Sequence, residues 1–255
     1  MLEVCSLTKR YSSIAAIENV SFGIEPGQVL GYLGPNGSGK STTVKIITGL
    51  LKQNSGTVLF RGRDIREDLT GYKRLVGYVP EEANLYPFLS GFEYLELVGR
   101  LRGLPSASCR RRILNLLELF SLSSSRHSAI STYSKGMRQR ILLMAALLHN
   151  PSLVVFDEPL SGLDVTSALI FRNLVTALRR EGKAIFYCSH VLEVVEKVCS
   201  HVTILQRGRQ VAYGSVEELR RFQTMPSLEA VFSNLVQETN VEECAAAIVD
   251  AVVSR

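Results

Sequence analysis

The sequence predicts an α/β protein with a mainly parallel sheet, and three observations support this fold class. A short apolar, β-prone run is followed by a glycine-rich loop and then by helical spacing of apolar residues (residues 29–51). After residue 151, continuous apolar runs that are typical of buried parallel strands alternate with helical segments. Between them, residues 88–150 show helical periodicity without β-branched runs, which indicates a helical insertion into the α/β core.

The first eighty residues are predicted to be mostly strands. A turn signal at residues 25–27 separates two of these strands, and Pro80 ends the last one. Strands are expected at residues 2–7, 17–24, 29–33, 57–60 and 75–79, with a turn at 61–63 and a helix at 42–51.

The remaining elements follow the same patterns. Ser215 with Glu218 forms a capping box, and Ser227 starts a further helix. Residues 241–253 carry apolar side chains on one helical face, so this helix packs on its own domain or on a partner. Helices are expected at residues 92–101, 108–120, 136–149, 168–180 and 191–198, and strands at 153–156, 184–188, 202–205 and 210–213.

Composition limits the class of protein. The 255 residues are 46% hydrophobic and 21% charged, with a net charge of +5, which permits contact with an anionic surface. The tight basic run at residues 110–112 is interpreted as a solvated helix face, and no aromatic residues interleave with a basic stripe, so no nucleic acid is expected as a partner. Five cysteines without a C-x-x-C pair indicate free thiols. Since neither a signal peptide nor a membrane-spanning run is recognised, a soluble, cytoplasmic protein is expected.

Residues 34–42 carry the pattern G-x-x-x-x-G-K-[ST] between a predicted strand and a predicted helix. Glycines allow backbone N–H groups to face a phosphate chain, and the helix N-terminus adds partial positive charge. Lys40 can reach the β- and γ-phosphates of ATP, and the Ser41 hydroxyl can ligate Mg²⁺. The expected nucleotide-binding residues of this loop are Gly34, Asn36, Gly37, Ser38, Gly39, Lys40, Ser41 and Thr42.

Two adjacent carboxylates follow the apolar strand at residues 153–156. Asp157 comes at the carboxyl end of this strand, where α/β proteins bind ligands, and can hold Mg²⁺. Glu158 comes next and can polarise a water aligned on the γ-phosphate. The sequence therefore predicts metal binding by Asp157 and catalysis by Glu158.

With the segment Tyr-Ser-Lys-Gly-Met-Arg-Gln-Arg at residues 133–140, the chain resembles the ATP-binding subunits of ABC transporters over about residues 2–232. The resemblance implies a P-loop NTPase core with a mainly parallel sheet, an N-terminal antiparallel β-subdomain and an inserted helical subdomain at about residues 88–150. It divides the chain into an ATP-binding domain at residues 1–232 and a C-terminal helical extension at residues 233–255.

The resemblance also implies roles for residues outside the loop. Tyr11 would stack on adenine, and His190 would act as the switch histidine that contacts the γ-phosphate. Glu81, at the position of the Q-loop glutamine, would bind Mg²⁺ or water, and Asp164 would lie in the D-loop. The signature motif, which would close over the ATP of the opposite subunit, would include Ser134, Gly136 and Met137.

Two departures from the common family pattern are similar to those of an exporter branch that pairs with separate permeases. The signature motif reads Tyr-Ser-Lys-Gly-Met instead of Leu-Ser-Gly-Gly-Gln, and Glu81 replaces a neutral amide, adding negative charge near ATP. Residues 82–101 form either a groove for a coupling helix of the permease or part of the core.

The resemblance implies an ATPase that dimerises head to tail on ATP and drives a separate membrane permease for export. Its partners would be a second ATP-binding subunit, as a homodimer or heterodimer, and an integral membrane permease. The chain would then lie on the inner face of the cell membrane through this permease. The alternative is a soluble ABC-type ATPase without a permease, acting in assembly or on nucleic acid.

Overall fold

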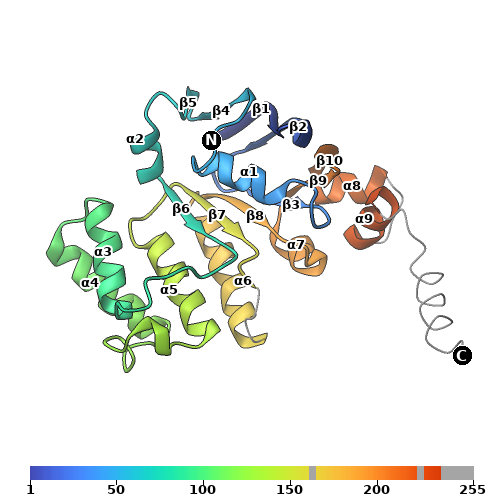
Figure 1. The fold of residues 1–255 in the computed structure, drawn as a ribbon. Coiled ribbons are helices and arrows are strands. Elements are labelled where there is room, and N and C mark those ends of the chain that lie inside the picture. The colour runs from blue at the N-terminus through green and yellow to red at the C-terminus, as the bar shows by residue number, and fades with distance from the viewer. Residues whose placement is uncertain (161–164, 223–226, 237–255) are drawn as a thin grey trace, which may run out of the picture.

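In the computed structural model, which describes residues 1–160, 165–222 and 227–236, two β-sheets pack around one helix (Figure 1). The smaller sheet is antiparallel and has the strand order β2-β1-β4-β5. Its strands are β1 (Leu2–Tyr11), β2 (Ile14–Ile24), β4 (Ser55–Phe60) and β5 (Arg63–Asp64).

The larger sheet has the order β10-β9-β3-β8-β7-β6, and all its neighbours are parallel except β9 and β10. Its strands are β3 (Val29–Leu33), β6 (Val76–Val79), β7 (Leu153–Asp157), β8 (Ala184–Cys188), β9 (His201–Gln206) and β10 (Arg209–Ser215). Side chains of β3, β7 and β8 alternate between two apolar clusters, one on each face of the sheet, which explains their continuous apolar sequences. The predicted α/β fold with a mainly parallel sheet is confirmed.

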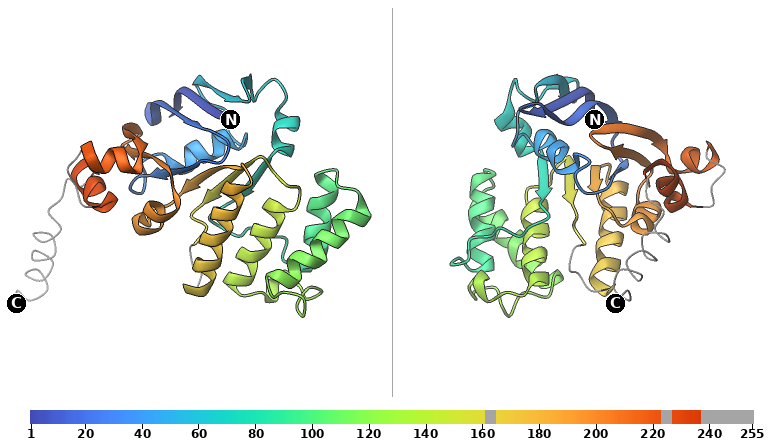
Figure 2. Two further views of the ribbon diagram at one scale, coloured as in Figure 1. Left: turned by 180° about the vertical axis from the view of Figure 1, so that it is seen from behind. Right: turned by 45° about the vertical axis from the view of Figure 1, so that its right-hand side comes forward.

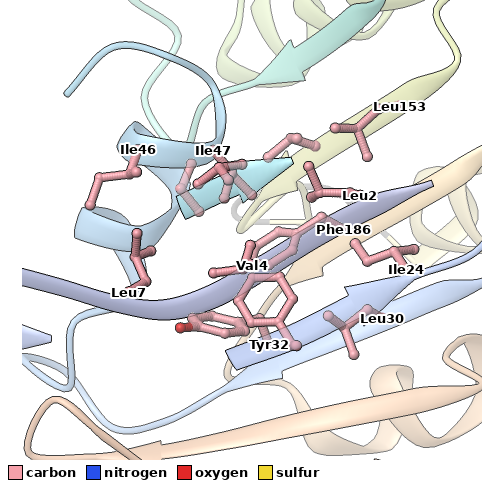
Figure 3. Packing of buried hydrophobic residues seen from close by; sticks show 14 of the residues in the cluster. Leu2, Val4, Leu7, Ile24, Leu30, Tyr32, Ile46, Ile47, Leu153 and Phe186 are labelled. Carbon is pink, nitrogen blue, oxygen red and sulfur yellow. The ribbon is translucent and has the colours of Figure 1, made fainter. Parts of the chain in front are cut away.

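Helix α1 (Lys40–Ile47) is packed between the two sheets. In Figure 3, Ile46 and Ile47 of α1 lie in the same cluster as Leu2 and Val4 of β1 and Phe186 of β8. All five side chains are buried, so burial on both sides fixes the position of this helix relative to the strand that precedes it.

Helices α3 (Gly91–Leu101), α4 (Ser106–Leu119) and α5 (Lys135–Leu147) form a group at one end of the molecule, shown in green shades in Figures 1 and 2. Helix α5 contributes Ile141 and Met144 to the core of this group, and Leu142 and Leu143 to the core under the large sheet. The helical insertion is therefore fastened to the α/β core through α5. The helices are α2 (Leu69–Arg74), α3 (Gly91–Leu101), α4 (Ser106–Leu119), the 3₁₀ turn η1 (Ile130–Thr132), α5 (Lys135–Leu147), α6 (Val165–Arg180), α7 (Leu192–Val198), α8 (Val216–Phe222) and α9 (Leu228–Val236).

The predicted elements agree with the structure apart from their ends, and three short elements were not predicted: helix α2, strand β5 and the 3₁₀ turn η1. Strand β1 continues to Tyr11, past its predicted end, because residues 9–11 pair with β2 in a hairpin. Helix α2 was not predicted; its N-cap is Asp68, whose carboxylate accepts a hydrogen bond from the Gly71 N–H at 2.8 Å. The predicted capping box is confirmed: the Ser215 N–H donates to Glu218 Oε2 at 2.9 Å, and the Glu218 N–H donates to Ser215 Oγ at 3.1 Å.

Some expectations fall outside the described residues. Asp164, predicted to lie in the D-loop, and the tail helix predicted at residues 241–253 are both outside the described residues. Among the helices that the structure does describe, none combines the length and the apolar character that crossing a bilayer requires.

Candidate nucleotide-binding site

The carboxyl ends of four neighbouring parallel strands bring the predicted phosphate-binding and acidic residues together. The glycine-rich loop follows β3, residues 189–190 follow β8, Asp157 and Glu158 lie at the end of β7, and Glu81 follows β6. A pocket of about 300 Å³ lies at this edge. It is lined by Ala16, Asn36, Gly37, Gly39, Lys40, Ser41, Thr42, Glu81, Asp157, Glu158 and His190.

The loop between β3 and α1 needs glycine at two positions with left-handed backbone conformations. Gly39 is the N-cap of α1 with φ 104°, and Gly37 has φ 80°. A Cβ on Gly39 would lie 2.4 Å from the Ala16 carbonyl oxygen, so β2 closes the loop from behind. The loop therefore turns sharply into the helix, whose first N–H groups can donate hydrogen bonds to a bound anion.

Lys40 is buried and lies against the loop. Its Nζ donates to the carbonyl oxygens of Gly34 at 2.7 Å and Pro35 at 3.1 Å. The Ser38 hydroxyl is also buried, and the described residues offer it no hydrogen-bond partner. A buried ammonium group and an unpartnered hydroxyl beside a helix N-terminus fit a bound phosphate.

Asp157 is buried and lines the pocket, and burial raises the pKa of its carboxyl group. The negative charges of Glu81 and Glu158 raise it further, while the Cys188 side chain and Lys40 oppose the shift. Within the described residues, no cluster of three or more His, Cys, Asp or Glu side chains is placed to hold a metal ion. Asp157 and the Ser41 hydroxyl offer the hard oxygen ligands that Mg²⁺ prefers, and Mg²⁺ usually completes its shell with water and substrate phosphates.

Glu158 and His190 are in direct contact. His190 Nδ1 lies 2.8 Å from Glu158 Oε1. The backbone of Glu158 has φ 46°, an uncommon value for a residue other than glycine. The pocket therefore holds a glutamate with an uncommon backbone conformation, and its carboxylate lies next to an imidazole at the place where the sequence predicts catalysis.

Six of the predicted site residues that the structure describes do not line this pocket: Gly34 and Ser38 of the loop, and Tyr11, Ser134, Gly136 and Met137. Tyr11 is half-exposed at the end of β1, and the Lys9 ammonium lies 5.4 Å from its ring centroid. Ser134 caps α5 and accepts a hydrogen bond from the Met137 N–H at 3.2 Å, while Gly136 has open space around its Cα. The predicted signature residues thus lie at the N-terminus of α5 and do not line the pocket of their own chain.

Three residues at or near the site were not predicted as site residues from the sequence: Ala16 of the pocket wall, and Gln139 and Ser189, whose side chains support the site. Ala16 lines the pocket from β2, which no local pattern could indicate. Gln139 is buried and donates to the Pro159 carbonyl oxygen at 3.2 Å, joining α5 to the turn after β7. Ser189 contacts Glu158. Its position directly before His190 was the available signal.

The fold and this pocket define a nucleotide-binding α/β domain, and comparison with known proteins gives its family. A family model described as ABC transporter matches residues 17–161. The ABC transporter ATP-binding protein NatA of Bacillus subtilis (strain 168) is 33% identical over 93% of this chain and 99% of its own. The linearmycin resistance ATP-binding protein LnrL of the same strain is 35% identical over 86% of this chain and 70% of its own. The chain belongs to the ABC transporter family, as an ATP-binding subunit.

Solved structures of ABC ATP-binding subunits have the same fold as this chain. A structure of an ATP-binding subunit of an ABC transporter superposes with a TM-score of 0.87 at 32% identity, covering 92% of this chain and 99% of the other. A dimeric post-hydrolysis state of the ATP-binding cassette MJ0796, bound to ADP and phosphate, superposes with a TM-score of 0.78 at 26% identity, covering 84% and 98%. The protein is an ATPase with the fold of ABC ATP-binding domains, and its family pairs with membrane permeases and dimerises.

Proposed function

We propose that this chain is the motor subunit of an exporter: two copies or two related chains close head to tail on ATP and drive a separate membrane permease. The observation that carries the ATP-hydrolysing part of the proposal is the convergence of Lys40, Asp157, Glu158 and His190 on one pocket. This set supplies a phosphate-binding cation, a metal carboxylate, a water-polarising carboxylate and a switch side chain.

In this proposal, the chain's own residues position the reactants. Lys40 exchanges its bonds to the loop carbonyls for the β- and γ-phosphates of ATP, and Glu158 orients the attacking water. Asp157, Ser41 and Glu81 would hold Mg²⁺. When bound, Mg²⁺ neutralises charge that develops on the transferred phosphoryl group.

The signature residues support the head-to-tail arrangement. Ser134 and Gly136 lie at the start of α5, and neither lines the pocket of the same chain. The N-terminus of α5 can therefore serve an ATP that is bound by another subunit, with its hydroxyl and N–H groups facing the γ-phosphate. The structural relative MJ0796 was solved as a dimer.

A separate surface is suited to the permease. A groove of about 500 Å³ runs along residues 81–87 and the start of α5. Beside it, the Phe88 side chain is 93% exposed and Tyr86 is exposed as well, whereas Leu85 packs against two apolar clusters. The segment is thus partly core and partly an exposed aromatic surface, and we assign the exposed part to a coupling helix of the permease. This contact would place the chain on the inner face of the cell membrane.

Export is supported by the sequence of the signature and Q-loop positions and by the relative that is named for linearmycin resistance. The sequence also predicts a division of the chain into an ATP-binding domain at residues 1–232 and an extension at residues 233–255. We include this division in the proposal.

Co-purification from detergent-solubilised membranes, which recovers a membrane protein that binds this chain, tests the proposal. Wild type should retain that protein, and Phe88→Ser should lose it while keeping its own ATPase activity. Leu119→Ser is the matched control, because Leu119 is 79% exposed at the end of α4, away from the groove. Recovery of no membrane protein would favour a soluble ATPase instead.

Glu158→Gln tests the catalytic assignment. It removes the charge that polarises water while keeping the shape of the side chain, so kcat for ATP should fall by about 10²–10⁴. An unchanged rate would show that Glu158 is not the catalytic carboxylate.

A further inference from the structure

The segment at the end of β8 contacts Glu158 through three consecutive residues. The Glu158 N–H donates to the Cys188 carbonyl oxygen at 2.9 Å. Ser189 Oγ donates to Glu158 Oε2 at 3.4 Å, and His190 Nδ1 lies 2.8 Å from Glu158 Oε1. The backbone and both carboxylate oxygens of Glu158 are therefore held by one neighbouring strand end.

These contacts have a physical reason. A residue other than glycine with φ 46° has a sparsely populated backbone conformation, which persists only where its surroundings over-determine it. The backbone bond to Cys188 fixes the turn after β7, and the two side-chain contacts fix the direction of the carboxylate.

Ser189 and His190 differ in how firmly they are placed. Ser189 is 1% exposed, and its Oγ accepts a hydrogen bond from the Val191 N–H at 3.1 Å. The hydroxyl hydrogen remains available for donation, and Glu158 Oε2 lies within reach at 3.4 Å. The His190 side chain is 67% exposed, so apart from its contact with Glu158 little packing opposes its rotation toward a phosphate in the pocket.

We propose that Ser189 is a positioning residue for ATP hydrolysis: its hydroxyl keeps hold of Glu158 Oε2 when His190 leaves Oε1 for the γ-phosphate. Oε1 then faces the attacking water, while the carboxylate cannot rotate away. This inference rests on the proposed role of Glu158. The Oγ–Oε2 distance of 3.4 Å is long for an O–H···O bond, and in this proposal the contact shortens in the reactive complex.

The test compares serine variants in the whole chain. Ser189→Ala should lower kcat for ATP about 10-fold, as loss of an orienting hydrogen bond does, while KM stays within about twofold. Ser189→Cys keeps the shape but has only a weak donor, so its kcat should lie between those of Ser189→Ala and wild type. Ser200→Ala is the control. Ser200 Oγ hydrogen-bonds the backbone of Val29 at the amino end of β3, whereas the pocket lies at the carboxyl ends of the strands. Loss of this hydroxyl should therefore leave kcat unchanged.

The outcomes separate this inference from the role on which it rests. The proposal is overturned if Glu158→Gln abolishes turnover but Ser189→Ala stays within twofold of wild type. It is also overturned if Ser200→Ala lowers kcat as much as Ser189→Ala, because the effect is then structural. In the double variant Glu158→Gln/Ser189→Ala, no loss beyond that of Glu158→Gln supports it, and a further 10-fold loss contradicts it. If Glu158→Gln itself retains full activity, the catalytic assignment fails instead.

Discussion

Replacing Gly39 by alanine is expected to destabilise the nucleotide-free protein by roughly 2–5 kcal/mol. A left-handed backbone costs an L-residue about 1–2 kcal/mol, and the φ of Gly39 is 104°. The new Cβ would lie 2.4 Å from the Ala16 carbonyl oxygen and 2.5 Å from Ile17 Cγ2. Since Ala16 belongs to the backbone of β2, the clash can be relieved only by moving the loop or the strand, and overpacking of this kind costs about 1–3 kcal/mol.

Gly37→Ala separates strain from clash. Gly37 has a similar left-handed conformation, with φ 80°, but a Cβ there would meet nothing within 4 Å. Its cost should therefore be limited to about 1–2 kcal/mol of backbone strain. Urea unfolding without nucleotide measures both variants, with equal m-values required for the comparison. Equal midpoints for the two variants would refute the reasoning, because β2 would then exert no steric effect on the loop.

Two further predictions concern buried polar contacts. Gln139→Leu leaves the buried Pro159 carbonyl without its donor and should cost about 1–3 kcal/mol by the same urea assay, whereas an unchanged midpoint would contradict the contact. His149 is the pH-dependent group: burial, with the charge of Arg102, lowers its pKa to about 4 from an ordinary value of 6.5, against the opposing hydrogen bond to the Val76 carbonyl. Because the unfolded chain binds this proton more readily, stability should fall as pH drops from 6.5 toward 4, and His149→Gln should flatten that part of the curve. Parallel curves for the two proteins would contradict this.

The central strands could be predicted from sequence because they are buried on both faces. Leu153, Val154, Val155 and Phe156 point alternately to two apolar clusters, and such a run has few other structural interpretations. The carboxyl ends of these strands carry the pocket, so predicting the strands also placed Asp157 and Glu158 next to the glycine-rich loop.

Helix α2 and the pocket wall could not be predicted in this way. Only Tyr72 of α2 is buried, so the helix has no apolar period, and it is held by tertiary contacts such as the hydrogen bond from the Tyr72 hydroxyl to the Ile47 carbonyl. Ala16 reaches the pocket only because β2 folds against the loop. Both depend on contacts between distant segments, which local patterns do not encode.

The contacts of Lys40 and His190 also point to an order of events in the proposed mechanism. Lys40 and His190, the two side chains assigned to the γ-phosphate, are already bonded within the protein, to the loop carbonyls and to Glu158 respectively. Binding of ATP must exchange these bonds, and the exchange at His190 releases Glu158 Oε1. The oxygen that would polarise water thus becomes available only when a phosphate has drawn His190 away, which couples activation of the water to the presence of ATP.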